Sequence, residues 1–129
     1  MDLWQGQRVR LRGVEPGDAN TFFAWRDSDM ERFTDFVRFP DSLEATRKHF
    51  EKMALPELKD DAFDFIIENE AGEVVGIINS HTCDRRVGCF MYGLAIGPAY
   101  RRHGYASEAI LLLLRYFFDE LNYQKVSAT

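Results

Sequence analysis

The stretch "YRRHGYASEA", residues 100–109, brings two arginines, a histidine and a glycine together in a predicted turn. The apolar run "FMYGLAIGP" precedes it, and the long apolar segment "AILLLLRYFF" follows it. This pattern predicts a buried strand, a tight turn and a helix. The first amides of a helix lack partners and carry partial positive charge, so such a turn can bind an anion through its backbone. We therefore interpret the turn as an anion site.

The side chains of the turn suit this interpretation. Gly104 can take a positive φ and let phosphate oxygens approach, Ala106 keeps the first helical turn thin, and Ser107 adds a hydroxyl. Positive charge comes from Arg101, Arg102 and His103. An ordinary turn glycine beside solvated arginines would explain the glycine equally well when it is taken alone. The turn lacks the Gly-Lys-Ser/Thr of a Walker A loop and the three spaced glycines of a dinucleotide fingerprint.

Length and composition limit the classes of protein. The chain has 129 residues, 46% hydrophobic and 14% aromatic, which predicts one compact domain over residues 1–129. The net charge of -5, from 21 acidic against 16 basic residues, argues against nucleic acid and anionic membranes as partners. Any bound anion must therefore be held locally.

The N-terminus and the cysteines point to a cytoplasmic protein without a metal site. The opening "MDLWQGQRVR" has no apolar signal region, and the longest apolar run, residues 109–114, is far too short to span a bilayer. Cys83 and Cys89 form no CxxC pair. We expect them to be reduced thiols rather than metal ligands, although they could face each other across a hairpin.

Periodicity predicts the remaining elements. Val9 and Leu11 alternate with arginines in a first strand, and Asp18 is expected to cap a short helix. A second helix is expected from the capping-box pattern "DSLE", Asp41 with Glu44, to Pro56. The strands "AFDFIIE", "VVGIINSH" and "CFMYGLAI" then form a meander. A helix from about residue 106 to 121 and a final strand in "QKVSAT" complete the order βααβββαβ.

The second predicted strand shows the alternation of side chains that is typical of a strand. In "AFDFIIE" the side chains of Phe63, Phe65 and Ile67 are expected to point inward. The strand is therefore expected to contribute three apolar side chains to the core.

Arg101, Gly104 and Ala106 match the signature Arg/Gln-x-x-Gly-x-Gly/Ala of the GNAT superfamily of N-acetyltransferases. The runs "YGLAIGPAYRRHGYASEAI" and "RVRLRGVEPGDA" and the tryptophan of "FFAWRDSD" resemble its branch of ribosomal-protein N-terminal and spermidine-type acetyltransferases. The resemblance extends from about residue 7 to the last residue. It implies an α/β fold with a mixed, mostly antiparallel sheet and helices on both faces. It also implies acetyl-CoA-dependent acetylation of a primary amine on a small molecule or a protein N-terminus.

The resemblance also implies a cofactor site. Backbone groups of the predicted fourth strand would contact the pantetheine arm of acetyl-CoA, and the turn would wrap the pyrophosphate. The implied cofactor-binding residues are Leu94, Ala95, Ile96, Arg101, Arg102, His103, Gly104, Tyr105, Ala106 and Ser107. Gly93 and Gly97 bracket this strand segment, and strand glycines often mark a bulge or a close backbone approach.

The implied chemistry is direct attack of a neutral amine on the thioester, with the oxyanion held by a backbone amide and no metal. The amine must first lose a proton, because lysine-like amines have a pKa of about 10.4 and α-amino groups one of about 7.7 to 8.0. Glu68, His81 and Tyr92 are the candidate catalytic residues, and each could equally be structural. An acidic stretch could attract a cationic amine or simply be a solvated loop. Its members are Asp27, Asp29, Glu31 and Asp35.

The sequence departs from the family pattern at its C-terminal end. By the resemblance, relatives continue past the fifth strand with a further helix and two strands, whereas this sequence stops at Thr129. We expect either a fragment of a longer protein or a fold that another chain completes. We therefore expect a sheet with an incomplete edge that could support self-association or a homodimer. Two other functions remain open, namely an acyl-CoA-binding module without turnover and a structural or dimerisation domain.

Overall fold

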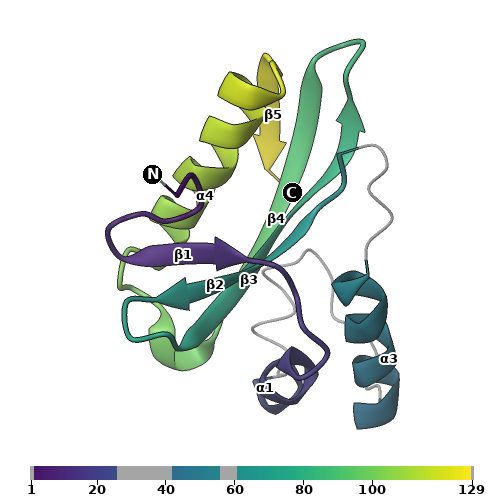
Figure 1. Cartoon of the computed structure of the whole chain (residues 1–129), viewed down its shortest axis with the longest axis vertical. Helices are drawn as coiled ribbons and strands as arrows, with labels where there is room; N and C mark the ends of the chain where they lie inside the picture. Colours follow the sequence, from purple (N-terminus) through teal and green to yellow (C-terminus); the bar gives the residue numbers. More distant parts are fainter. Residues whose placement is uncertain (1, 26–41, 56–60, 129) are drawn as a thin grey trace.

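The computed structural model describes residues 2–25, 42–55 and 61–128 (Figure 1). The strands are β1 (Val9–Arg12), β2 (Asp64–Asn69), β3 (Val74–Asp84), β4 (Cys89–Ile96) and β5 (Lys125–Ala128). The helices are α1 (Asp18–Ala24), α3 (Leu43–Ala54) and α4 (Tyr105–Arg115), with a 3-10 turn η1 (Pro98–Tyr100) and a π-helical turn η2 (Tyr116–Glu120). The described elements confirm the expected order of strands and helices.

The five strands form one sheet in the order β1-β2-β3-β4-β5. Neighbouring strands are antiparallel except β4 and β5, which are parallel. The chain reaches β5 from β4 through α4, as a parallel pair requires. Helix α4 packs on one face, and α1 and α3 pack on the other (Figure 1). The mixed, mostly antiparallel sheet with helices on both faces is therefore confirmed.

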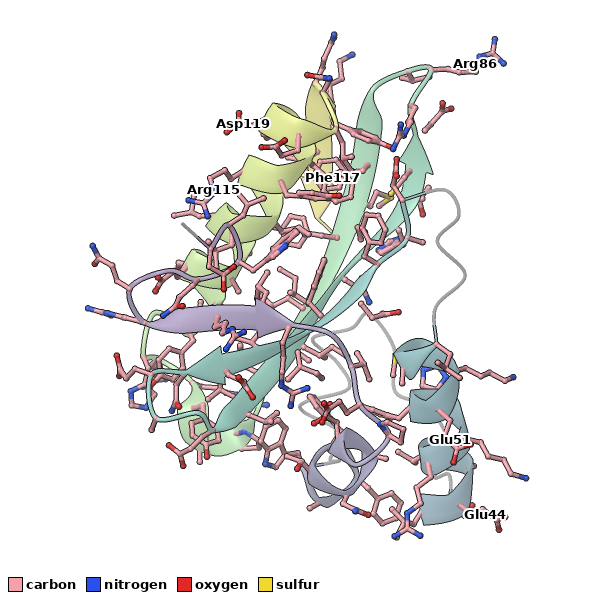
Figure 2. The ribbon with its side chains drawn as sticks, in the orientation of Figure 1. Glu44, Glu51, Arg86, Arg115, Phe117 and Asp119 are labelled. Carbon is pink, nitrogen blue, oxygen red and sulfur yellow. The ribbon has the colours of Figure 1, made fainter. Side chains whose placement is uncertain are left out.

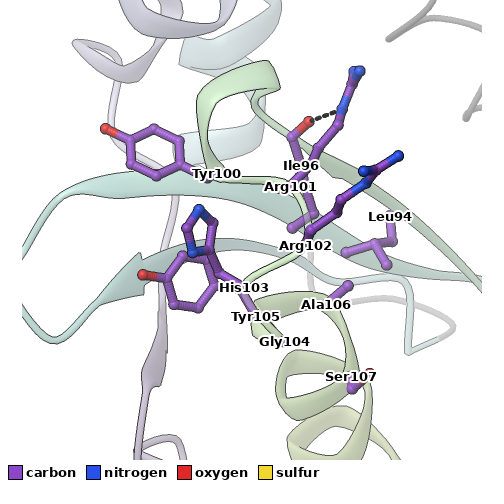
Figure 3. Close-up of a pocket in the computed structure, with 10 residues that line it drawn as sticks. All are labelled: Leu94, Ile96, Tyr100, Arg101, Arg102, His103, Gly104, Tyr105, Ala106 and Ser107. Atoms are coloured by element: carbon purple, nitrogen blue, oxygen red, sulfur yellow. Dashed lines mark hydrogen bonds between the residues drawn. The ribbon is translucent and has the colours of Figure 1, made fainter.

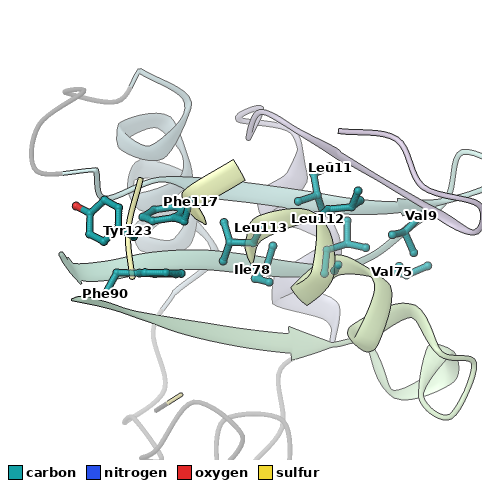
Figure 4. Close-up of a cluster of buried hydrophobic side chains, with 11 residues drawn as sticks. Val9, Leu11, Val75, Ile78, Phe90, Leu112, Leu113, Phe117 and Tyr123 are labelled. Carbon is teal, nitrogen blue, oxygen red and sulfur yellow. The ribbon is translucent and has the colours of Figure 1, made fainter. Parts of the chain in front are cut away.

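The larger core cluster lies between the sheet and α4 (Figure 4). Phe90 of β4 stacks on Phe117, with ring centroids 4.0 Å apart, and Tyr123 packs edge-on against Phe90 at 5.4 Å. The smaller cluster on the other face consists of Val14, Ala19, Phe50 and Ile66. Together the two clusters keep both faces of the central strands out of water.

Strand β2 and the residue before it bury the three side chains expected from the sequence and one more. Phe63, Phe65 and Ile67 do pack toward the α4 cluster, as expected. Ile66, however, is also fully buried, on the face that carries α1 and α3. Both sides of β2 are buried because helices cover both faces of the sheet, as the family resemblance implied.

The helix ends also depart from the expected ones. The N-cap of α3 is Ser42, whose Oγ accepts a hydrogen bond from the Ala45 amide at 3.0 Å, and Asp41 lies outside the described residues. The N-cap of α1 is Gly17, so Asp18 is the first helical residue and not the cap. Helix α4 starts at Tyr105 and gives way to the π-helical turn after Arg115, earlier than expected.

Residues 2–12 form an N-terminal hairpin that ends in β1. Its cross-strand hydrogen bonds run from the Gly6 amide to the Val9 carbonyl and from the Leu11 amide to the Trp4 carbonyl, both at 2.8 Å. The hairpin lies along α4, where the Arg115 guanidinium donates to the Leu3 carbonyl (Figure 2). This arrangement brings the start of the sequence beside the helix that opens the predicted anion site.

Candidate functional site

The loop between η1 and α4 has the backbone shape predicted from its glycine. Gly104 is the N-cap of α4, with φ 77° and ψ 6° in the left-handed region. Arg102 also has a positive φ, of 66°. An L-residue in this region costs about 1 to 2 kcal/mol, so Arg102 holds a conformation that would suit a glycine better. Two left-handed residues in quick succession bend the chain sharply just before the helix.

The backbone amides of this loop are available to a ligand. Among the described residues, none accepts a hydrogen bond from the amides of residues 102–107. The first helical amide with an acceptor among the described residues is that of Glu108, which donates to the Gly104 carbonyl at 3.3 Å. Unpaired amides at a helix N-terminus, together with the helix dipole, favour a bound anion.

A cavity of about 610 Å³ opens in front of these amides (Figure 3). Its lining residues are Leu94, Ile96, Tyr100, Arg101, Arg102, His103, Gly104, Tyr105, Ala106 and Ser107. The structure thus gathers every residue expected to contact the cofactor except Ala95, which is buried. Tyr100 was missed, and no signal in its local sequence marks it as a lining residue.

The charged lining residues are all basic. Arg101 and Arg102 lie side by side over Leu94 and Ile96, and Arg101 Nε donates to the Ile96 carbonyl at 3.4 Å (Figure 3). On the helix side, the His103 ring stacks on Tyr105 with centroids 5.4 Å apart. No acidic side chain is among the described lining residues. The cavity therefore combines backbone donors with positive side chains, as an anion site needs.

Strand β4 carries the apolar side of the cavity. All of β4 runs beside β3, whereas its described pairing with β5 covers only residues 89–92. Leu94 and Ile96 line the cavity on the segment beyond that pairing. Gly93 and Gly97, which flank this segment, have protein atoms close to the position of a Cβ. A Cβ at Gly97 would lie 2.9 Å from the Trp25 ring, and one at Gly93 would lie 3.1 Å from Asn79 Oδ1.

The three candidate catalytic residues do not line this cavity. Glu68 accepts a hydrogen bond from Arg12 Nε at 2.7 Å. His81 contacts the Thr82 hydroxyl through Nδ1 at 2.9 Å, and Tyr92 packs against the core cluster beneath α4. A catalytic role for any of them stays a prediction, and the acidic stretch at residues 27–35 lies outside the described residues.

Arg12 joins Glu68 to α1. Its Nη2 donates to Asp18 Oδ1 at 2.8 Å, and the Asp18 carboxylate also accepts from the Glu15 amide. Burial raises the pKa of Asp18, but the hydrogen bonds from Arg12 and Glu15 outweigh burial and hold that pKa below its ordinary value. The Arg12 pKa is raised, chiefly by its hydrogen bond to Asp18. This paired network stabilises the junction between the sheet and α1.

A second polar cluster lies around Asp61, which precedes β2. Its carboxylate accepts from Arg85 Nη2 at 2.8 Å and from the Tyr123 hydroxyl at 2.7 Å. The Arg85 hydrogen bond lowers the pKa of Asp61 most, burial opposes it, and Tyr123 adds to the lowering. Burial and the hydrogen bond to Asp61 raise the pKa of Tyr123. The cluster ties the start of β2 to the chain that enters β5.

The described residues also bear on metal binding and on membrane insertion. Residues 2–25, 42–55 and 61–128 contain no group of three or more His, Cys, Asp or Glu that could hold a metal ion. Within the same ranges, no helix has the length and apolar character needed to cross a membrane.

Comparison with known proteins agrees with this geometry. Residues 8–129 match the family described as the Acetyltransferase (GNAT) domain. The chain is 39% identical over 126 residues to the SPbeta prophage-derived uncharacterized N-acetyltransferase YokL of Bacillus subtilis (strain 168). That match covers 98% of this chain and 68% of YokL.

Solved structures show the same fold. A probable acetyltransferase superposes with a TM-score of 0.83 at 19% identity, over 95% of this chain and 70% of the other. RimL, a ribosomal L7/L12 alpha-N-protein acetyltransferase, superposes with a TM-score of 0.77 at 15% identity, over 95% of this chain and 67% of RimL. With the match over residues 8–129, these findings show that the chain belongs to the GNAT family of acetyltransferases.

Proposed function

We propose that this protein binds acetyl-CoA in the cavity at the start of α4 and transfers the acetyl group to a primary amine. The observation that carries the proposal is the set of amides at residues 102–107, which have no acceptor among the described residues and open a helix beside basic side chains. Membership of the GNAT family supports the acetyl transfer. The amine substrate is defined only by its class.

The residues present fit the pyrophosphate of coenzyme A. Backbone amides of residues 102–107 would hold the phosphate oxygens, and the Ser107 hydroxyl can add a further donor. Arg101, Arg102 and His103 would offset the negative charge. At about 610 Å³, the cavity also falls within the usual range for small-molecule sites, about 300 to 1,000 Å³.

The pantetheine arm would follow the apolar side of the cavity. Leu94 and Ile96 offer side-chain surface there, on the segment of β4 beyond its described pairing with β5. Backbone groups of this segment would bind the amides of the arm as a neighbouring strand would. Bound acetyl-CoA supplies a thioester whose carbonyl carbon is the electrophile for the amine.

The protein must also favour the neutral form of the amine. A protonated amine has no lone pair for attack, so a group of the chain or the solvent must accept its proton. Glu68, His81 and Tyr92 remain the candidates, and of these Glu68 would first have to leave Arg12. RimL is named as an acetyltransferase of the α-amino group of a ribosomal protein, and the name of YokL specifies only N-acetyl transfer. Protein N-termini and small-molecule amines are therefore both candidate substrates.

Titration calorimetry with CoA and an assay of thiol release with a panel of amines test the proposal together. We expect CoA to bind, and acetyl-CoA to release its thiol only when an accepted amine is present. Failure to bind CoA would contradict the proposal and leave a structural role. CoA binding without thiol release for any amine would instead favour an acyl-CoA-binding module.

A further inference from the structure

The loop that precedes α4 is hydrogen-bonded to Arg8, a residue almost a hundred positions earlier in the sequence. Arg8 Nη1, from the N-terminal hairpin, donates a hydrogen bond to the His103 carbonyl at 3.1 Å, across 95 residues of sequence. Arg8 is exposed and is not among the residues that line the cavity. Its guanidinium therefore contacts the loop outside the cavity.

This contact fixes the direction of one backbone amide. The described chain has no cis peptide bond, so the peptide between His103 and Gly104 is trans. In a trans peptide the carbonyl and the following N–H point in opposite directions. Because the His103 carbonyl points at Arg8, the Gly104 N–H points away from Arg8. Gly104 itself lines the cavity, and its amide has no acceptor among the described residues.

The glycine at position 104 makes room for the same contact. A Cβ built on Gly104 would lie 2.9 Å from Arg8 Nη1, and no other heavy atom beyond the adjacent residues would lie within 4 Å. The missing side chain would thus point at Arg8 and not at a phosphate oxygen. The sequence predicts a glycine at position 104 for its positive φ and for the approach of a ligand. The structure gives a further reason, which is the Arg8 guanidinium beside Gly104.

Arg8 is itself anchored to the helix that the loop opens. Both carboxylate oxygens of Glu108, in the first turn of α4, accept from the Arg8 amide at 3.0 Å. Gly6 allows this approach, since a Cβ there would lie 1.9 Å from Glu108 Oε1. The Arg8 backbone therefore binds the helix just after Gly104, and its side chain binds the loop just before Gly104.

We propose that Arg8, anchored by Glu108, is a positioning residue that aims the Gly104 amide at the pyrophosphate of CoA. The inference rests on the proposed function, because it assumes that the loop binds that pyrophosphate. It predicts that Arg8 affects ligands that carry the pyrophosphate and spares ligands that lack it. A purely structural Arg8 would affect both kinds alike.

The test compares Arg8→Met with Arg10→Met, using CoA and pantetheine as probes in titration calorimetry. Arg10 lies two residues further on, in β1, and is exposed, so its variant removes the same charge without touching the loop. Arg8→Met should weaken CoA about tenfold, the equivalent of about 1.4 kcal/mol, and leave pantetheine unchanged. Arg10→Met should change neither ligand more than twofold. Arg8→Lys, which keeps a donor, should recover part of the lost CoA affinity.

Salt distinguishes positioning from simple attraction. Between exposed charges, attraction is largely screened when ionic strength rises from about 0.1 M to about 1 M. Positioning through the His103 carbonyl is a matter of geometry, so the tenfold difference between wild type and Arg8→Met should persist over that range. A difference that disappears at high salt, or an equal loss in Arg10→Met, would overturn the inference in favour of charge.

Gly6→Ala gives an independent variant that leaves Arg8 in place. The new methyl group must displace the Glu108 carboxylate, so CoA should again weaken while pantetheine does not. Gly13→Ala is the matched control, because no heavy atom lies within 4 Å of its Cβ position. Normal CoA affinity in folded Arg8→Met and Gly6→Ala would overturn this inference alone. Absence of CoA binding by the wild-type protein would overturn the proposed function and this inference with it.

Discussion

Replacing Gly104 by alanine separates the two reasons for a glycine at the start of α4. The first reason is the φ of 77°, which costs an L-residue about 1 to 2 kcal/mol. The second is Arg8 Nη1, which would lie 2.9 Å from the new Cβ and would have to leave the His103 carbonyl, at a cost of about 0.5 to 1.5 kcal/mol. Loss of glycine freedom in the unfolded chain offsets about 0.4 to 1 kcal/mol of this. We expect Gly104→Ala to lower the free energy of unfolding by about 2 kcal/mol.

Urea unfolding followed by tryptophan fluorescence measures this change. Gly13→Ala is the control, because Gly13 has neither a positive φ nor a neighbour within 4 Å of its Cβ position. That variant should be neutral or slightly more stable than the wild type. Equal stability of Gly104→Ala and Gly13→Ala would refute the assignment of a strained position at Gly104.

A double-mutant cycle isolates the part that is due to Arg8. In an Arg8→Met background the guanidinium is absent, so Gly104→Ala should retain only the cost of its φ. The substitution should then cost about 1 kcal/mol less than it does in the wild type. The same cost in both backgrounds would show that Arg8 does not press on the Gly104 position.

Three further predictions concern the paired networks and the chemistry. Glu68→Gln should lower the melting temperature by a few degrees through its weaker bond to Arg12, with kcat within tenfold of wild type. A loss of kcat of about a hundredfold or more, at unchanged stability, would instead identify Glu68 as the base. Tyr123→Phe removes a donor to the Asp61 carboxylate and should raise the Asp61 pKa. Because the folded-state pKa of Asp61 is depressed, its stabilisation is present above the unfolded pKa of about 3.9 and is lost as pH falls. The variant should therefore be less stable at neutral pH and unfold at a higher pH in an acid titration, whereas Tyr116→Phe should not. Finally, the rate of acetyl transfer should rise between about pH 6 and pH 9 as the amine loses its proton, and a flat profile with chemistry rate-limiting would contradict direct attack.

Self-association through the sheet edge also stays a prediction. In the described sheet β5 is an edge strand that pairs only with β4, and an edge strand presents unpaired backbone groups to another chain. Sedimentation at micromolar concentration measures it directly, and a monomer at all concentrations would contradict it.

The fold could be predicted largely because its signals are local. The apolar strand, the glycine turn and the apolar helix follow one another within residues 89–115, so periodicity alone places them in order. The positive φ of Gly104 also follows from its place in a tight turn. The side of β2 that carries Ile66 was missed because burial of that side depends on α1 and α3, which alternation within β2 does not report.

The contacts of Arg8 with the loop and with α4 could not be predicted for a related reason. Arg8 is one of three arginines that alternate with Val9 and Leu11 in the sequence, and nothing near it in the sequence distinguishes it. Its partners His103 and Glu108 become neighbours only when the hairpin lies against α4. The left-handed Arg102 escapes prediction as well, because sequence rules assign that conformation to glycine or asparagine.

Three hydrogen-bonded contacts join the N-terminal hairpin to α4 and to the loop before it, and they affect how the molecule folds. These contacts join residues separated by 95, 100 and 112 positions, whereas the hairpin of β3 and β4 closes over a short turn. Contacts between distant residues form slowly, because a large loop must close before they repay its loss of entropy. We expect residues 102–107 to reach their final shape late in refolding, after the central strands have paired. During synthesis on the ribosome, the N-terminal hairpin could then bind α4 only after almost the whole of this sequence has emerged.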